Sequence, residues 1–115
     1  MASSETVFHL PEGSAEYGAG ALGNVANLLA DETVDVEVAV VANGGGVEHL
    51  LDRAPTAGKV RELLDRGVEV NACGNTLAKA DDFDESDLVD GVAVVSSGVG
   101  ELTRRQADGA GYVRP

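Results

Sequence analysis

Cys73 is the only cysteine in the 115-residue chain, and it stands where a strand is expected to turn into a helix. The surrounding sequence is Val68-Glu69-Val70-Asn71-Ala72-Cys73-Gly74-Asn75-Thr76. A thiolate at a helix N-terminus is stabilised by free backbone N–H groups and by the helix dipole, which lowers its pKa. The N–H groups of Asn75 and Thr76 could face the sulfur, and Gly74 would keep the backbone close. The same surroundings would hold a persulfide, whose outer sulfur is anionic near neutral pH.

The residues alone leave two interpretations of Cys73 open. A single cysteine excludes an intramolecular disulfide and a Cys-x-x-Cys redox pair. A sulfur atom bound to it would therefore wait for an external acceptor, as it does in a sulfur carrier. Free cysteines are also often buried and inert, here as the end of a strand.

The stretch Gly18-Ala19-Gly20-Ala21-Leu22-Gly23 matches Gly-x-Gly-x-x-Gly but does not predict a dinucleotide cofactor. That fingerprint must lie directly between a strand and a helix, whereas residues 11–17 intervene here. Ser14 is the expected N-cap, which puts the three glycines inside the helix and makes close helix packing the better explanation. We expect no cofactor.

The two histidines, His9 and His49, have no close spacing to each other or to Cys73, so no metal site is predicted. His9 lies near the end of the first expected strand and either lines the pocket or sits in the core. His49 is expected on the exposed side of a short helix. The acidic loop 81–87 fails as a calcium loop because Asp87 stands where a glycine is required.

Strands alternate with helical stripes throughout the chain, which predicts a single α/β domain over residues 1–115 with a flavodoxin-like parallel sheet. The strand order 2-1-3-4-5 is taken from that fold class. Asp84 is expected to cap a turn in the acidic loop. We expect strands at 6–10, 33–42, 68–73, 92–95 and about 112–113, and helices at 14–30, after 46, at 56–67, from 76 and at 99–108.

In a doubly wound parallel sheet, the binding site lies beyond the carboxyl ends of the strands. Four small, polar turns meet there, at 10–12, 43–46, 73–76 and 96–98. The glycine run that follows Asn43 could be an anion-binding nest, but a turn that needs positive φ angles explains it sufficiently. We therefore predict Cys73 as the reactive residue and, as binding residues around it, Asn43, Gly44, Gly74, Asn75, Thr76, Ser96 and Ser97.

The composition is strongly acidic, with 20 Asp and Glu against 8 Lys and Arg, for a net charge of −12. Such a charge repels phosphate backbones and anionic lipid surfaces, so neither nucleic acid nor a membrane is an expected partner. The acidic, lysine-poor composition favours a halophilic source, where salt screens the repulsion. No signal peptide and no apolar run of about 20 residues is present, so we expect a cytoplasmic protein.

The sequence resembles the DsrE/DsrF-like family, the small proteins of intracellular sulfur oxidation and sulfur relay. The resemblance implies a three-layer α/β/α domain with a parallel five-stranded sheet and homo-oligomers, commonly trimers or hexamers. In the better-understood members, the cysteine at the position of Cys73 carries sulfur as a persulfide and passes it to a partner. The segments that carry the similarity are 7–10, 22–29, 42–44, 67–77, 97–106 and 111–113.

These observations predict a sulfur-relay protein in which Cys73 takes sulfur from a donor, a protein or a small thiol, and passes it to an acceptor. A sulfurtransferase-like activity is compatible with this role. The alternative is a non-catalytic, oligomeric binding module that holds a small anionic ligand in the same pocket.

Overall fold

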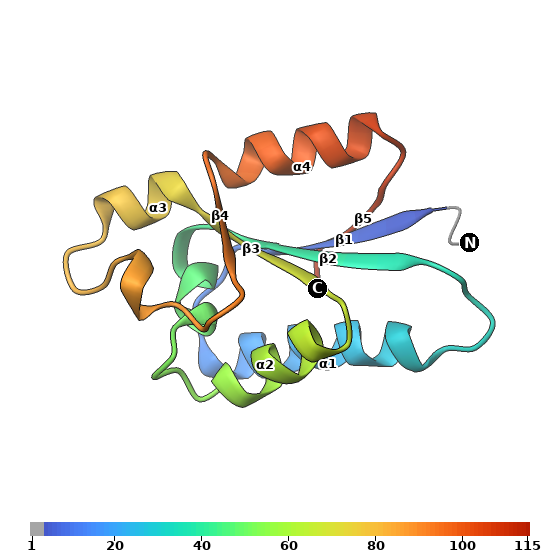
Figure 1. Ribbon diagram of the computed structural model, residues 1–115, viewed down its shortest axis with the longest axis horizontal. Coiled ribbons are helices and arrows are strands. Elements are labelled where there is room, and N and C mark those ends of the chain that lie inside the picture. Colours follow the sequence, from blue (N-terminus) through green and yellow to red (C-terminus); the bar gives the residue numbers. More distant parts are fainter. Residues whose placement is uncertain (1–3) are drawn as a thin grey trace.

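The computed structural model describes residues 4–115, which build one all-parallel sheet of five strands between two layers of helices (Figure 1). This confirms the α/β fold class. The elements are, in chain order, β1 (Glu5–Leu10), α1 (Ala15–Ala30), β2 (Glu37–Ala42), the 3-10 helix η1 (Gly44–Leu50), α2 (Ala57–Asp65), β3 (Glu69–Cys73), α3 (Gly74–Lys79), the 3-10 helix η2 (Glu85–Asp87), β4 (Ala93–Val95), α4 (Gly98–Ala107) and β5 (Gly111–Val113).

The strands lie in the order β4-β3-β2-β1-β5, so the expected flavodoxin order 2-1-3-4-5 is wrong. β2, not β1, lies beside β3. The chain steps from β1 to β2 and from β2 to β3 through α1 and α2, which pass over the same face of the sheet. The connection that contains α3 and η2 then places β4 beside β3. The chain then returns through α4 to place β5 on the far side of β1.

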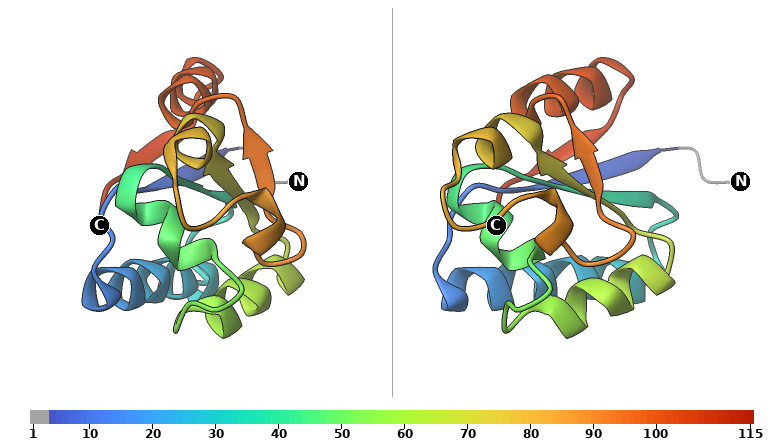
Figure 2. Two further views of the ribbon diagram at one scale, coloured as in Figure 1. Left: turned by 90° about the vertical axis from the view of Figure 1, so that its left-hand side faces the viewer. Right: turned by 60° about the vertical axis from the view of Figure 1, so that its left-hand side comes forward.

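The two faces of the sheet are covered differently (Figures 1 and 2). α1, η1 and α2 lie on one face, whereas α3 and α4 lie on the other. The larger core cluster includes Leu22, Val40 and Leu63. A much smaller cluster under α4 contains Val7, Ala39, Val41 and Leu102. Side chains alternate between the two faces along each strand. The residue two positions after each strand residue of this cluster therefore also faces α4.

Most expected element boundaries are confirmed within two residues, with one clear exception. β2 begins at Glu37 rather than at residue 33. The backbone N–H and the hydroxyl of Thr33 both donate to Asp31 Oδ1, at 2.9 and 2.6 Å, which makes a turn in place of the first strand residues. Ser14 caps α1 by accepting the Tyr17 N–H, and Asp84 forms a capping box at η2, as expected.

The three glycines of the Gly-x-Gly-x-x-Gly stretch lie inside α1, as expected. One of them, Gly18, leaves the space that the ring of His49 occupies. A Cβ at Gly18 would lie 2.4 Å from the ring of His49, so close packing is confirmed at this glycine. His49 is buried, and its Nε2 donates to the Glu12 carbonyl at 2.7 Å. The expectation of an exposed His49 is therefore wrong: η1 turns this side chain toward α1. Among residues 4–115, no helix is long and apolar enough to cross a bilayer.

Candidate functional site

Cys73 is the last residue of β3 and the N-cap of α3, at the carboxyl edge of the sheet. Only 6% of its surface is exposed. α3 starts at Gly74, directly after the strand, because Gly74 lets the backbone pass close to β4: a Cβ there would be 2.6 Å from the Val95 carbonyl oxygen. The first N–H groups of α3 thus lie beside the thiol, as the sequence predicted.

Burial raises the pKa of the Cys73 thiol, but hydrogen bonds to the sulfur outweigh that effect and leave the pKa below its ordinary value. The donors are the Thr76 hydroxyl and the backbone N–H groups of Gly98, Thr76 and Asn75. Donors that favour the charged form of an acid lower its pKa. Two helices, α3 and α4, contribute them, so the thiolate is stabilised by separate parts of the chain.

Thr76 connects the thiol to the turn after β2. Its Oγ1 accepts the Gly44 N–H at 2.9 Å. A hydroxyl has one hydrogen, so a Thr76 oxygen that accepts from Gly44 remains free to donate to the sulfur. Gly44 has a φ of 54°, which confirms the expected need for positive φ in this turn.

Gly98, the first residue of α4, is a site residue that the sequence did not predict. The Ser97 hydroxyl caps α4 by accepting the Gly100 N–H at 2.9 Å. A Cβ at Gly98 would lie 3.0 Å from Asn43 Cβ and 3.4 Å from Cys73 Cβ. Only a glycine lets this helix end approach both side chains, and the Ser97-Gly98-x-Gly100 pattern of a cap followed by small residues was the available signal.

His9, for which the sequence left a pocket position and a core position open, lies on the α4 face of the sheet. Its Nε2 donates to Asn43 Oδ1 at 2.8 Å, and its Nδ1 lies 2.6 Å from the hydroxyl oxygen of Tyr112. Of the two alternatives for His9, the structure supports a position beside the pocket over a place in the core. The sequence gave no signal for Tyr112, which comes from β5 at the end of the chain.

The structure therefore gathers five of the seven predicted binding residues around Cys73: Asn43, Gly44, Gly74, Asn75 and Thr76. Ser97 contributes to the site indirectly, because its hydroxyl caps α4, the helix that begins at Gly98. Ser96 is exposed in the turn between β4 and α4. In the part of the chain from residue 4 onward, no three His, Cys, Asp or Glu side chains gather as metal ligands.

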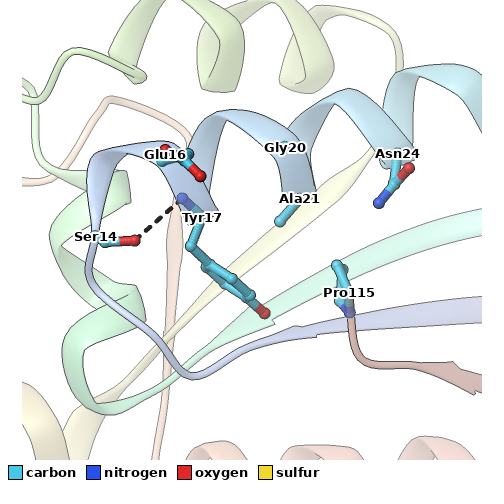
Figure 3. A pocket seen from close by; sticks show the side chains of 7 residues that line it. All are labelled: Ser14, Glu16, Tyr17, Gly20, Ala21, Asn24 and Pro115. Carbon is cyan, nitrogen blue, oxygen red and sulfur yellow. Dashed lines mark hydrogen bonds between the residues drawn. The ribbon is translucent and has the colours of Figure 1, made fainter.

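One cavity, of about 490 Å³, is lined by none of the residues around Cys73 (Figure 3). It is open, and Tyr17, Gly20 and Asn24 of α1 line it together with Pro115. A second cavity, of about 410 Å³, has Gly44 and Thr76 in its wall, and both residues belong to the Cys73 site. Lys79, Asp82 and Phe83 form its outer side. Position next to the chemistry makes this second cavity the better candidate for the approach to the site.

The chain is thus an α/β protein with a parallel sheet and one cysteine at the carboxyl edge of that sheet, beside the first residues of two helices. The chain belongs to the DsrE/DsrF-like family, whose model matches residues 7–115. The family expected from the sequence is thus confirmed.

Two solved structures share this fold over nearly the whole chain. A protein of unknown function from Methanobacterium thermoautotrophicum, MTH1491, is 42% identical, with a TM-score of 0.90 over 98% of this chain and 100% of that one. The ychN protein from E. coli is 14% identical, with a TM-score of 0.78 over 97% and 99% of the two chains, and it shows the fold alone. None of the curated proteins compared with the sequence matches it.

Proposed function

We propose that this protein is a sulfur-relay protein that carries a sulfane sulfur as a persulfide on Cys73. The observation that carries the proposal is the position of the only cysteine, at the N-cap of α3 and against the first residue of α4, where the Thr76 hydroxyl and nearby backbone N–H groups lower the pKa of its thiol. Membership of the DsrE/DsrF-like family supports a role of this type.

The chemistry needs no added oxidant or reductant. The Cys73 thiolate attacks the outer sulfur of a donor persulfide R–S–SH; a new S–S bond forms, the old one breaks, and the donor leaves as the thiolate R–S⁻. An acceptor thiolate then takes the outer sulfur by the same step, and Cys73 leaves as a thiolate. The lowered pKa of the Cys73 thiol helps both steps, because a thiolate is the nucleophile in the first and the leaving group in the second.

The partners follow from the same chemistry. They are donors and acceptors that present a sulfur at the end of a narrow group, because only 6% of the surface of Cys73 is exposed. A small thiol or a cysteine on an extended protein segment fits that requirement. We further propose that the protein works in the cytoplasm as a homo-oligomer, a trimer or a hexamer, as the family resemblance implies.

Intact-mass measurement after incubation with a small persulfide donor tests the relay. We expect a gain of one sulfur atom, removed by a reductant and absent in Cys73→Ser. Alkylation of the unmodified thiol with iodoacetamide is the control for access. A thiol that is alkylated readily but takes up no sulfur would rule out the relay.

The burial of Cys73 favours one second function, a binding module for a small anion. If the thiol does not react, the cavity beside it, with Gly44 and Thr76 in its wall, would be the place for such an anion. Calorimetry with sulfate on wild type and Cys73→Ser separates the two. Binding that survives in Cys73→Ser, in a protein that takes up no sulfur, supports the module.

A further inference from the structure

Four neighbouring strands each place one polar side chain on the α4 face at the carboxyl edge of the sheet. Tyr112 of β5 is in register with Val7 of β1, so it shares a face with His9, two residues further along β1. His9 is in register with Val41 of β2, and Asn43 follows Val41 by two residues.

The same alternation brings Asn43 beside Cys73. Ala42 is in register with Ala72, and the next residue of each strand turns to the α4 face. Both residues have extended backbone angles, with φ of −139° at Asn43 and −70° at Cys73. Adjacent strands lie about 4.8 Å apart, so the two side chains are direct neighbours.

The hydrogen bonds along this row have a defined direction. Asn43 Oδ1 only accepts, so His9 Nε2 carries the hydrogen, and His9 Nδ1 is then left to accept from the Tyr112 hydroxyl. With its oxygen held by His9, the Asn43 amide must turn its NH₂ group the other way. That group donates to no other residue within 4–115, yet no buried side-chain nitrogen in this range lacks a partner. It therefore borders open space.

The Asn43 and Cys73 side chains both lie against the first residue of α4. A Cβ at Gly98 would lie 3.6 Å from Asn43 Cγ and 3.4 Å from Cys73 Cβ. The inner sulfur already takes its hydrogen bonds from Thr76, Asn75 and Gly98. A second sulfur atom would extend about 2 Å beyond it. The Asn43 amide nitrogen, which has no hydrogen-bond partner among residues 4–115, belongs to a side chain that shares the Gly98 contact with Cys73.

We propose that His9 and Tyr112 are positioning residues that hold the Asn43 amide nitrogen toward the outer sulfur of a persulfide on Cys73. This inference rests on the proposed function and adds the group that recognises the transferred atom. When an acceptor thiolate attacks the outer sulfur, the S–S bond breaks and the electron pair stays on Cys73. The Thr76, Asn75 and Gly98 donors receive that thiolate, while Asn43 releases the departing sulfur.

A chemically installed persulfide tests this inference without depending on the protein's own sulfur uptake. The Cys73 thiol is converted to a mixed disulfide with thiopyridine, and hydrosulfide then displaces the thiopyridine to leave Cys73–S–SH. The loaded protein is equilibrated with glutathione, and intact mass gives the sulfur retained. We expect the exchange constant of Asn43→Ala to favour glutathione about tenfold more than that of wild type, because a hydrogen bond to an anion is lost.

The positioning residues have matched controls. In His9→Ala and Tyr112→Phe, the exchange constant should favour glutathione about threefold more than in wild type. His9→Gln should retain sulfur like wild type, because a glutamine nitrogen can still donate to Asn43. Tyr17→Phe removes the other tyrosine hydroxyl near His9, which donates to the His9 carbonyl at 3.4 Å, and should change nothing. The alkylation rate of the unmodified thiol should stay the same in His9→Ala and Tyr112→Phe, because neither residue touches the inner sulfur.

The outcomes separate this inference from the proposed function. Equal retention by wild type and Asn43→Ala overturns the inference even if the relay operates. Loss in His9→Gln as large as in His9→Ala overturns the positioning role. Retention that depends on Asn43 in a protein that accepts no sulfur from a donor supports the inference and rejects the relay. A Cys73 that cannot be loaded by this route overturns both.

Discussion

The two ends of α4 meet the same face of the sheet in opposite ways. At its C-terminal end, Arg105 donates to three carboxylates: Glu5 at 2.5 Å, Glu69 at 2.9 Å and Glu101 at 2.8 Å. Glu5 and Glu69 open β1 and β3, so this cluster fastens the amino edge of the sheet to the helix. Every nitrogen of the guanidinium has a fixed acceptor.

At its N-terminal end, the same helix directs the Gly98 N–H toward the Cys73 sulfur, whose charge and bonding can change. The Cys73 sulfur can be a thiol, a thiolate or one half of a persulfide, and the four donors around it favour its charged forms. From this difference we infer that the Arg105 donors, whose acceptors are fixed carboxylates, contribute to the stability of the fold. The donors around Cys73 instead contribute to the reactivity of its sulfur. Each end can therefore be altered without the other.

Arg105→Met should produce the largest effect, and it should act on stability alone. The Arg105 side chain is 13% exposed, and its removal leaves half-buried carboxylates without a partner. We expect a loss of about 2–3 kcal/mol of unfolding free energy at neutral pH, less than for a fully buried pair because Glu69 is largely exposed. Urea denaturation measures it, and alkylation of Cys73 in the folded variant should be unchanged.

Arg104→Met is the matched control for this variant. Arg104 pairs only with Glu101 and is 59% exposed, so we expect a loss below about 0.5 kcal/mol. If Arg105→Met cost no more than Arg104→Met, or if it slowed alkylation, the separation between the two ends of α4 would be wrong.

Local patterns predicted much of the fold, because they act between residues close in the sequence. The Ser14 cap, the turn at Gly44 and the start of a helix beside Cys73 are of this kind. The strand order was not predictable from such patterns, since element lengths do not say whether β3 pairs with β1 or β2, or on which side of β1 the last strand returns. The same holds for the Arg105 cluster, which joins residues 100 positions apart.

The candidate site divides in the same way. Asn75 and Thr76 were predicted because they follow Cys73 directly. Gly98 was not singled out, although its turn was placed at the site. The His9–Tyr112 contact was missed because it depends on the sheet register, and the two residues are 103 positions apart in the sequence. Asn43 was predicted to shape the pocket, but its hydrogen bond to His9 required the pairing of β1 with β2.

Thr76→Val should produce the second largest effect, confined to the N-terminal end of α4 and the Cys73 sulfur beside it, which we call the reactive end. It keeps the shape of the side chain but removes the hydroxyl that donates to the sulfur, so the pKa of the Cys73 thiol should rise. We expect iodoacetamide alkylation at neutral pH to slow about tenfold. Thr76→Ser keeps the hydroxyl and should react nearly as fast as wild type. A serine variant as slow as the valine variant would assign the effect to packing instead.

Lowering the pH should produce the smallest effect, and it should change the contribution of the C-terminal end of α4 only. The Arg104 hydrogen bond, opposed by burial and aided by Arg105, holds the pKa of Glu101 below its ordinary 4.5. This stabilisation is complete above the unfolded pKa and is lost as the pH falls through the folded one. The stability difference between wild type and Arg105→Met should therefore shrink as the pH falls from neutral through the pKa of Glu101, because the part of this stabilisation that Arg105 contributes is lost.

The reactive end should show no such change over that range. The pKa of the Cys73 thiol is also lowered by folding, but from an ordinary value of 9.0, so its stabilisation appears in full only above that pH. Thr76→Val should thus differ from wild type by the same unfolding free energy at mildly and at strongly acidic pH. An acid-dependent difference in Thr76→Val, or none in Arg105→Met, would show that the two ends of α4 are coupled.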